Sequence, residues 1–163
     1  MRPMSSCLAV IGLAGALAAP AAAQLLTEKS LSAGMAMAIA QTALETCSKQ
    51  GYHVSVHVLG RNGEGLVAVR GDGAPPHTME NSQRKAYTAR TFGIPSGEFV
   101  QRVKDNPNLG AVHLTGIIAA QGALPIKAGD GVIGAVGVSG APGGEKDEAC
   151  AKAGIDKVAD QLK

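Results

Sequence analysis

The spacing of apolar side chains changes at Gly51, from the period of a helix to the period of a strand. Over 27–50, apolar residues such as Leu31 and Met35 recur at helical spacing. Over 52–59, valines alternate with polar side chains, as in a strand with one buried face. A long amphipathic helix followed directly by such a strand buries its apolar face against a sheet. The sequence therefore predicts a fold of helices packed on strands.

Turn and cap residues divide the next stretch into a hairpin and two helices. Asn62-Gly63 favours a tight turn, so the strand that follows pairs antiparallel with the first. Thr78 is expected to cap a helix over 79–92, and Ser96 a shorter helix that ends before Asn106-Pro107.

The C-terminal part predicts further strands and a final helix. The region 111–140 is apolar, rich in glycine and prone to β structure, and its turns divide it into three strands, the last over 132–139. An acidic start at Glu145 opens a helix that continues to Leu162. The order αββααβββα predicts an α+β fold: a five-stranded antiparallel sheet with the terminal helices on one face and the middle helices beside it.

Composition excludes several classes of protein. Of the 163 residues, 45% are apolar and 17% charged, which is too hydrophobic for a disordered chain and fits one domain. A net charge of +2 and 2% aromatic residues provide neither a dense basic patch nor stacking platforms. Nucleic acid is therefore not an expected partner.

Residues 1–23 resemble a secretory signal peptide. Arg2 precedes an uncharged apolar run over 8–19, and small residues at 21–23 suit cleavage after Ala23. The run is too short for a membrane anchor, which needs about 20 apolar residues. We expect a periplasmic or secreted protein without a stable membrane anchor, folded as one domain over 24–163.

Two cysteines remain after the predicted cleavage. In an oxidising compartment, an even number favours a disulfide between Cys47 and Cys150, and no C-x-x-C spacing indicates zinc. Two free, buried thiols are the alternative. If the first and last helices run antiparallel on one face, the two cysteines meet, so the predicted disulfide and the predicted topology support each other.

Several separate motifs resemble those of the GlcG/HbpS-like haem-binding family. They are Asp72-Gly73-Ala74-Pro75-Pro76-His77-Thr78, Arg84-Lys85-Ala86-Tyr87-Thr88-Ala89, Leu124-Pro125-Ile126-Lys127, Gly137-Val138-Ser139-Gly140 and Gly143-Gly144-Glu145-Lys146-Asp147-Glu148. The resemblance extends from about Leu31 to Leu162 and implies a profilin-like sandwich, homo-oligomers and, for some members, binding of haem or its iron. Relatives occur beside glycolate-oxidation genes and as the C-terminal domain of PduO.

A haem site needs an axial donor, an apolar slot, and cations or hydroxyls for the propionates. His77 is the first choice of iron ligand, because it lies in a proline-stiffened loop and matches the family motif; a bond to nearby backbone is the alternative. A threonine ligand is known in the family, which adds two hydroxyl candidates. The predicted cofactor-binding residues are His77, Thr78, Arg84, Lys85, Tyr87 and Thr88. For Arg84, Lys85 and Tyr87, a solvated helix face is the alternative.

The other histidines are weaker candidates. His53 and His57 share one face of a strand but stand about 13 Å apart, so they cannot hold one metal ion, and surface or sheet-to-helix packing is expected. His113, in a region expected to be strand, is an alternative iron donor. The Glu145-x-x-Glu148 spacing resembles iron-binding pairs of the family, although helix N-terminal charge explains it equally well.

Known catalytic motifs are absent from the sequence: it has no G-x-S-x-G, H-E-x-x-H or P-loop. We therefore expect a binding protein before an enzyme. Exported haem scavenging, storage or sensing comes first. The alternatives are a role in small hydroxy-acid utilisation with Arg84 and Lys85 holding the carboxylate, haem degradation, or a structural oligomer without a ligand. The small number of aromatic residues predicts a shallow haem site. A location at a subunit interface is one form of this prediction.

Overall fold

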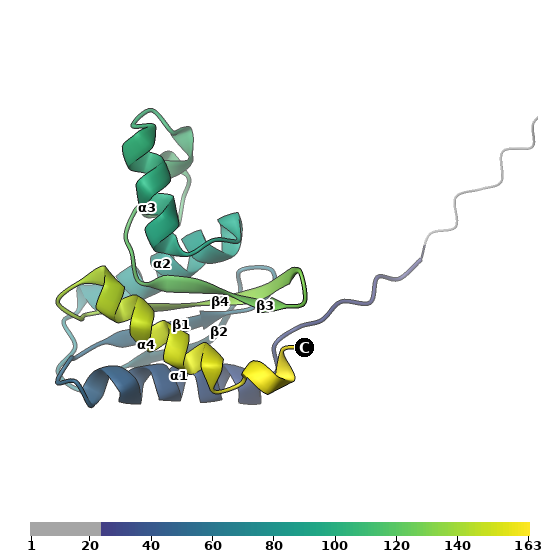
Figure 1. Ribbon diagram of the computed structural model, residues 1–163, viewed down its shortest axis with the longest axis horizontal. Coiled ribbons are helices and arrows are strands. Elements are labelled where there is room, and N and C mark those ends of the chain that lie inside the picture. Colours follow the sequence, from purple (N-terminus) through teal and green to yellow (C-terminus); the bar gives the residue numbers. More distant parts are fainter. Residues whose placement is uncertain (1–23) are drawn as a thin grey trace, which may run out of the picture.

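Four antiparallel strands form one sheet, in the order β2-β1-β4-β3 (Figure 1). In the computed structural model, which describes residues 24–163, the strands are β1 (Ser55–Leu59), β2 (Gly65–Arg70), β3 (Ala123–Ala128) and β4 (Gly131–Ser139). The central strands β1 and β4 pair with each other, and β2 and β3 form the two edges. The predicted leader over 1–23 lies outside the described residues.

Helices cover both faces of this sheet. They are α1 (Ala33–Ser48), α2 (His77–Phe92), α3 (Ser96–Asp105) and α4 (Gly144–Asp156), with short 3-10 turns at Gly110–His113 and Ala159–Gln161. α1 and α4 pack side by side on one face, while α2 lies on the other and α3 projects beyond it (Figure 1). None of the helices in the described part is long and apolar enough to cross a membrane.

The sheet corrects the predicted architecture in two respects. It has four strands instead of five, because residues 111–122 form a 3-10 turn and irregular chain, not a strand. This segment has the composition of a strand because it contains aliphatic residues, one of which, Ile117, is buried. The helix α2 lies on the sheet and not beside it, so β1 is buried on both faces, although its alternating pattern predicted only one buried face.

Helix ends also differ from the predicted bounds. α1 begins at Ala33 and not at the predicted position 27, and residues 24–32 are non-helical. At the start of the helix, the Ser32 hydroxyl accepts the Met35 N–H. α4 ends at Asp156 instead of Leu162 and is followed by a 3-10 turn. Neither Thr78 nor Ser96 is an N-cap: both lie inside their helices, with their hydroxyls bonded elsewhere.

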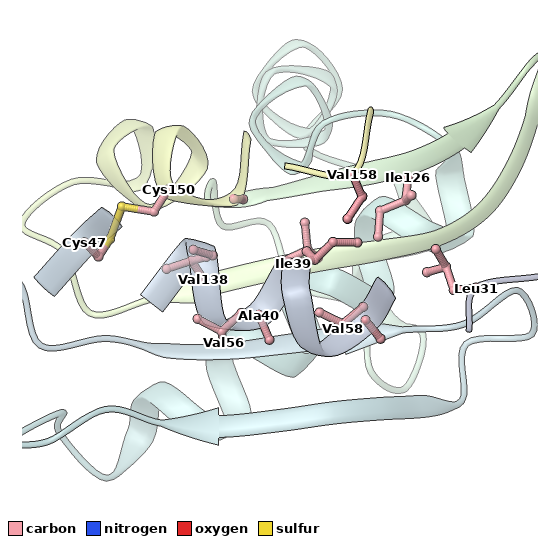
Figure 2. Packing of buried hydrophobic residues seen from close by; sticks show 14 of the residues in the cluster. Leu31, Ile39, Ala40, Cys47, Val56, Val58, Ile126, Val138, Cys150 and Val158 are labelled. Carbon is pink, nitrogen blue, oxygen red and sulfur yellow. A yellow bond between two sulfur atoms is a disulfide. The ribbon is translucent and has the colours of Figure 1, made fainter. Parts of the chain in front are cut away.

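The face of the sheet toward α1 and α4 is apolar. Val56 and Val58 of β1 point into it, as does Val54 just before the strand, in agreement with their alternation. Val56 and Val58 pack with Ile39 and Ala40 of α1 (Figure 2). At one end of this layer, a disulfide joins Cys47 to Cys150, with Cα atoms 5.7 Å apart. The predicted disulfide is thus present and ties the first helix to the last.

The face toward α2 combines a small apolar cluster with polar contacts; the cluster consists of Leu59, Ala86, Ala89, Ala123 and Ala135. The Ser55 and Thr78 hydroxyls lie 2.7 Å apart, and His57 Nδ1 lies 2.8 Å from Ser82 Oγ. Gly137 allows this close approach, because a Cβ there would stand only 2.2 Å from the Ser82 carbonyl oxygen. Directional hydrogen bonds and one glycine therefore set the position of α2.

Candidate functional site

All six predicted binding residues lie on α2, but the helix presents them to different surroundings. Thr78, Lys85 and Thr88 are buried, Arg84 is partly exposed, and His77 and Tyr87 are exposed. Their exposed members line two separate hollows on the flanks of the helix. The structure therefore does not bring the predicted set together at one site.

The larger hollow, here named the Tyr87 hollow, has a volume of about 740 Å³. It lies between α2 and the loop that follows the 3-10 turn at 110–113. Its lining consists of Gly63, Glu80, Gln83, Arg84, Tyr87 and residues 112–116. It thus joins two predicted binding residues to His113, the alternative iron donor.

Two glycines hold the Tyr87 ring in place. A Cβ on Gly63 would lie 2.9 Å from the ring, and one on Gly116 would lie 3.0 Å from it. Both glycines have left-handed backbone, with φ of 81° and 83°, which other residues rarely adopt. The ring is therefore fixed between the β1–β2 turn and the 116 loop, and it forms a rigid wall of the hollow.

Arg84 connects α2 to the opposite wall of the Tyr87 hollow. One of its terminal nitrogens donates to the Ile117 carbonyl at 2.9 Å, and the other lies 3.5 Å from a Glu80 carboxylate oxygen. The longer contact is a weak, partly exposed ion pair. Since a guanidinium has five N–H donors, Arg84 retains donors for an anionic ligand.

The smaller hollow, here named the Lys85 hollow, has a volume of about 390 Å³. It lies where the start of α2 meets the start of α4. Its lining consists of Pro75, His77, Asn81, Lys85, Ala120, Gln121, residues 139–144 and Asp147. His77 is exposed at this hollow, in keeping with its position at the start of the helix.

A buried ion pair forms the floor of the Lys85 hollow. Lys85 Nζ lies 2.8 Å from Asp147 Oδ2 and donates to the Val138 carbonyl at 3.1 Å, and both charged side chains are at most 5% exposed. Asp147 Oδ1 also accepts the Ala141 N–H at 2.9 Å. Burial raises the pKa of Asp147, while the hydrogen bond and charge of Lys85 oppose the rise. Lys85 is thus a buried structural cation and not part of a solvated face.

The two threonines are bonded to the scaffold. Thr78 donates toward the Pro75 carbonyl at 2.7 Å and meets Ser55. The Thr88 hydroxyl accepts the Ile118 N–H at 3.0 Å, which anchors the loop below the Tyr87 hollow. Both side chains are fully buried, so a cofactor would reach them only after these contacts break.

The histidines separate into structural and accessible groups. His57 packs between sheet and helix, and burial lowers its pKa. His53 is exposed, with Nδ1 2.7 Å from the Asp72 carbonyl oxygen. His113 lies on a 3-10 turn and not on the expected strand, and its side chain is exposed at the Tyr87 hollow. The accessible imidazoles at the two hollows that flank α2 are therefore His77 and His113.

Glu145 and Glu148 face a third, mainly apolar groove of about 640 Å³ between α4 and β3. Glu148 accepts a hydrogen bond from Gln121 at 2.9 Å. Within residues 24–163, no group of three or more His, Cys, Asp or Glu side chains is placed to hold a metal ion. The acidic pair lies in the first turns of α4, where negative charge favours the helix N-terminus.

Sequence reasoning missed the partners that shape these hollows. In the sequence, Asp147 is one acidic residue of a family motif, and its contact with Lys85 spans 62 positions. Gly63 was assigned to a turn, and Gly116 carried no signal of its own. The sequence contains one sign of a buried counter-charge: Lys85 lies among small residues on the buried face of α2.

The comparison with protein families matches residues 31–156 to the family described as haem degrading protein HbpS-like. The protein belongs to this HbpS-like family. The match covers every α-helix and strand of the described residues. Among the curated proteins, nothing matches.

Solved structures share the fold. A double mutant of HbpS from Streptomyces reticuli is 37% identical, with a TM-score of 0.78 over 85% of this chain and 96% of that one. The Klebsiella pneumoniae protein ORFY is 25% identical, with a TM-score of 0.78 over 85% and 97%. PduOC, solved as a haem complex, is 23% identical, with a TM-score of 0.71 over 78% and 94%, and supports the fold only.

Proposed function

We propose that this protein is an exported haem-binding protein that acts in haem or iron scavenging, storage or sensing. Its match to the haem-degrading HbpS-like family over residues 31–156 carries the proposal. The PduOC complex adds that a protein of this fold holds haem. The partners that the protein meets after export would determine whether it scavenges, stores or senses haem.

The Tyr87 hollow contains the groups that a haem needs. His113 offers an imidazole for the iron, and Val112 and Leu114 offer apolar surface for the macrocycle. Arg84 offers guanidinium donors for a propionate. A volume of about 740 Å³ lies within the usual range of ligand sites. Bound iron would supply redox and oxygen chemistry, which the protein would position.

His77 is the competing iron ligand. It is the donor that the family motif favours, and its ring is exposed at the rim of the Lys85 hollow. That hollow is smaller, and its cation is already paired with Asp147, so Lys85 is not free to neutralise a propionate. We therefore propose haem at the Tyr87 hollow, with His113 as donor, and treat His77 as the alternative.

Export is the second part of the proposal. It rests on the predicted leader over 1–23 and agrees with the disulfide between Cys47 and Cys150, because such bonds persist in oxidising compartments. Amino-terminal sequencing of the protein recovered from the periplasm or medium would test it. A mature chain beginning at Gln24 is expected, and retention of Met1 would overturn this part.

The decisive experiment is a haemin titration of tag-free protein, followed through the Soret band. Three proteins are compared: the wild type, His113→Ala and His77→Ala. Each variant lacks one exposed imidazole and keeps the other, so each variant serves as the control for the other. We expect saturable binding by the wild type at a fixed stoichiometry, a shifted and weakened Soret band in His113→Ala, and an unchanged one in His77→Ala.

Other outcomes reassign the site or the function. A change only in His77→Ala would move the haem to the Lys85 hollow. No saturable shift in the wild type would exclude haem binding and leave the small hydroxy-acid role, which predicts saturable ligand binding without a chromophore. Loss of the haemin spectrum with release of iron under reducing conditions would add haem degradation to the function.

A further inference from the structure

The first residues of the described chain lie apart from the folded body. Residues 24–30 are exposed and non-helical, and they lead away from the sheet and its helices (Figure 1). Leu25 is 98% exposed and Leu26 is 80% exposed. Export with cleavage after Ala23, on which this inference rests, would therefore leave Gln24 as the first residue of a freely accessible end.

Contacts between this segment and the rest of the protein involve residues beyond Gln24. Glu28 Oε2 lies 3.0 Å from Arg61 Nε, and Lys29 Nζ donates to the Lys163 carbonyl at 3.0 Å. Within residues 24–163, these are the first side-chain hydrogen bonds or ion pairs along the sequence. Nothing in the described chain therefore holds the Gln24 carboxamide away from its own backbone nitrogen.

A glutamine at a free amino terminus can close a ring on itself. Its α-amino nitrogen attacks the side-chain carbonyl carbon, Cδ, and the product is a five-membered lactam. The new N–Cδ bond replaces the bond from Cδ to the side-chain nitrogen, which takes one proton from the α-amine and leaves as ammonia. No oxidant, metal or cofactor takes part. An α-amine has an ordinary pKa of about 8, so part of it is unprotonated and nucleophilic at neutral pH.

We propose that Gln24 becomes the amino-terminal residue on export and is then converted to pyroglutamate. The conversion removes the free α-amine together with its positive charge. The mature chain then begins with an uncharged lactam, continues with Leu25 and Leu26, and carries its first charge at Glu28. Exposed chain ends are preferred sites of proteolysis, and aminopeptidases bind a free α-amine. The lactam therefore protects an end whose two leucines are otherwise accessible.

A second sequence in the chain favours loss of ammonia by ring closure. In Asn62-Gly63, attack by the Gly63 nitrogen on the Asn62 side chain would form a succinimide. That nitrogen is engaged in the turn, because the Gly63 N–H donates to the Gly60 carbonyl at 3.1 Å. Both closures lower the mass by the same amount, so the experiment has to locate the loss in the sequence.

The test compares the wild type with Gln24→Asn, both recovered after export and sampled over several days, because ring closure without an enzyme is slow. Asparagine keeps the carboxamide, but the same attack would close a strained four-membered ring. The wild type should lie about 17 Da, the mass of ammonia, below the unmodified mature chain, and Gln24→Asn should show no loss. Trypsin cuts after Lys29, so the loss should appear in peptide 24–29 and not in 62–70, which contains Asn62.

Resistance to an aminopeptidase gives a second measurement. The wild type should keep its mass, whereas Gln24→Asn should lose residues from its end up to the contacts of Glu28 and Lys29. Amino-terminal sequencing should read the variant directly and the wild type only after enzymatic removal of pyroglutamate. These readouts report the chemistry of the terminus and do not depend on haemin binding.

The contrary outcomes separate this inference from export. A wild type that is cleaved after Ala23 and keeps an unmodified Gln24 would overturn the proposal and leave export in place. A mature chain that begins at another residue would do the same. A recovered chain that keeps Met1 would overturn both export and the modification.

Discussion

The two faces of the sheet solve the packing problem with opposite chemistry. Toward α1 and α4, aliphatic side chains interdigitate and a disulfide closes the layer. Toward α2, hydroxyls and an imidazole make discrete hydrogen bonds, such as Ser55 with Thr78, beside a small cluster of Leu59 and alanines. An ion pair between Lys85 of α2 and Asp147 of α4 joins the two helices. Apolar contacts are non-directional and tolerate small shifts, whereas each polar pair fixes one distance and orientation.

This difference explains where the candidate site lies. α2 lines both the Tyr87 hollow and the Lys85 hollow, so its position decides the geometry of each. A helix held by directional bonds presents Arg84 and Tyr87 at fixed points, while the apolar layer behind the sheet supplies stability. The predictions below perturb the ion pair between α2 and α4, the apolar layer and the polar contacts of α2 in turn, in order of expected effect.

The largest effect is expected from Asp147→Ala, at the contact between α4 and α2. It leaves the Lys85 ammonium buried without its counter-charge, and removing one partner of a buried pair costs about 3–5 kcal/mol. Urea unfolding measures the loss. The double variant Lys85→Met/Asp147→Leu should recover much of it, since no buried charge remains; equal stability of the two variants would refute the account.

A smaller loss is expected when the apolar face loses its disulfide. Cys47 and Cys150 are 103 positions apart, and removal of such a bridge typically costs about 2–4 kcal/mol. The variant Cys47→Ala/Cys150→Ala should unfold at lower urea yet bind haemin as the wild type does, because the bridge lies on the face away from α2. Loss of haemin binding in a folded variant would show that the faces are coupled.

The smallest effect concerns His57 and pH. Burial lowers its pKa in the folded state, so below about pH 6.5, the ordinary value, the unfolded chain takes up a proton before the folded protein does. The contribution of His57 to stability is thus complete above that pH and is lost as the pH falls through the lowered pKa. The difference in unfolding free energy between wild type and His57→Gln should shrink over this range; a constant difference would contradict it.

Local patterns predicted most of the elements. The period change at Gly51, the Asn62-Gly63 hairpin and the pairing of Cys47 with Cys150 are all present in the structure. The extra strand was predicted wrongly over 111–122, because aliphatic residues in an irregular loop, of which Ile117 is buried, have the composition of a strand. The caps at Thr78 and Ser96 were wrong because tertiary partners took their hydroxyls.

The sequence by itself determined the class of fold, the family and the face of β1 that carries the valines, since these follow from periodicity and motifs along the chain. Only the tertiary structure decided that His77 and Tyr87 border different hollows and that Lys85 is buried against Asp147. These features depend on contacts between residues far apart in sequence, and no local pattern encodes which distant groups will meet.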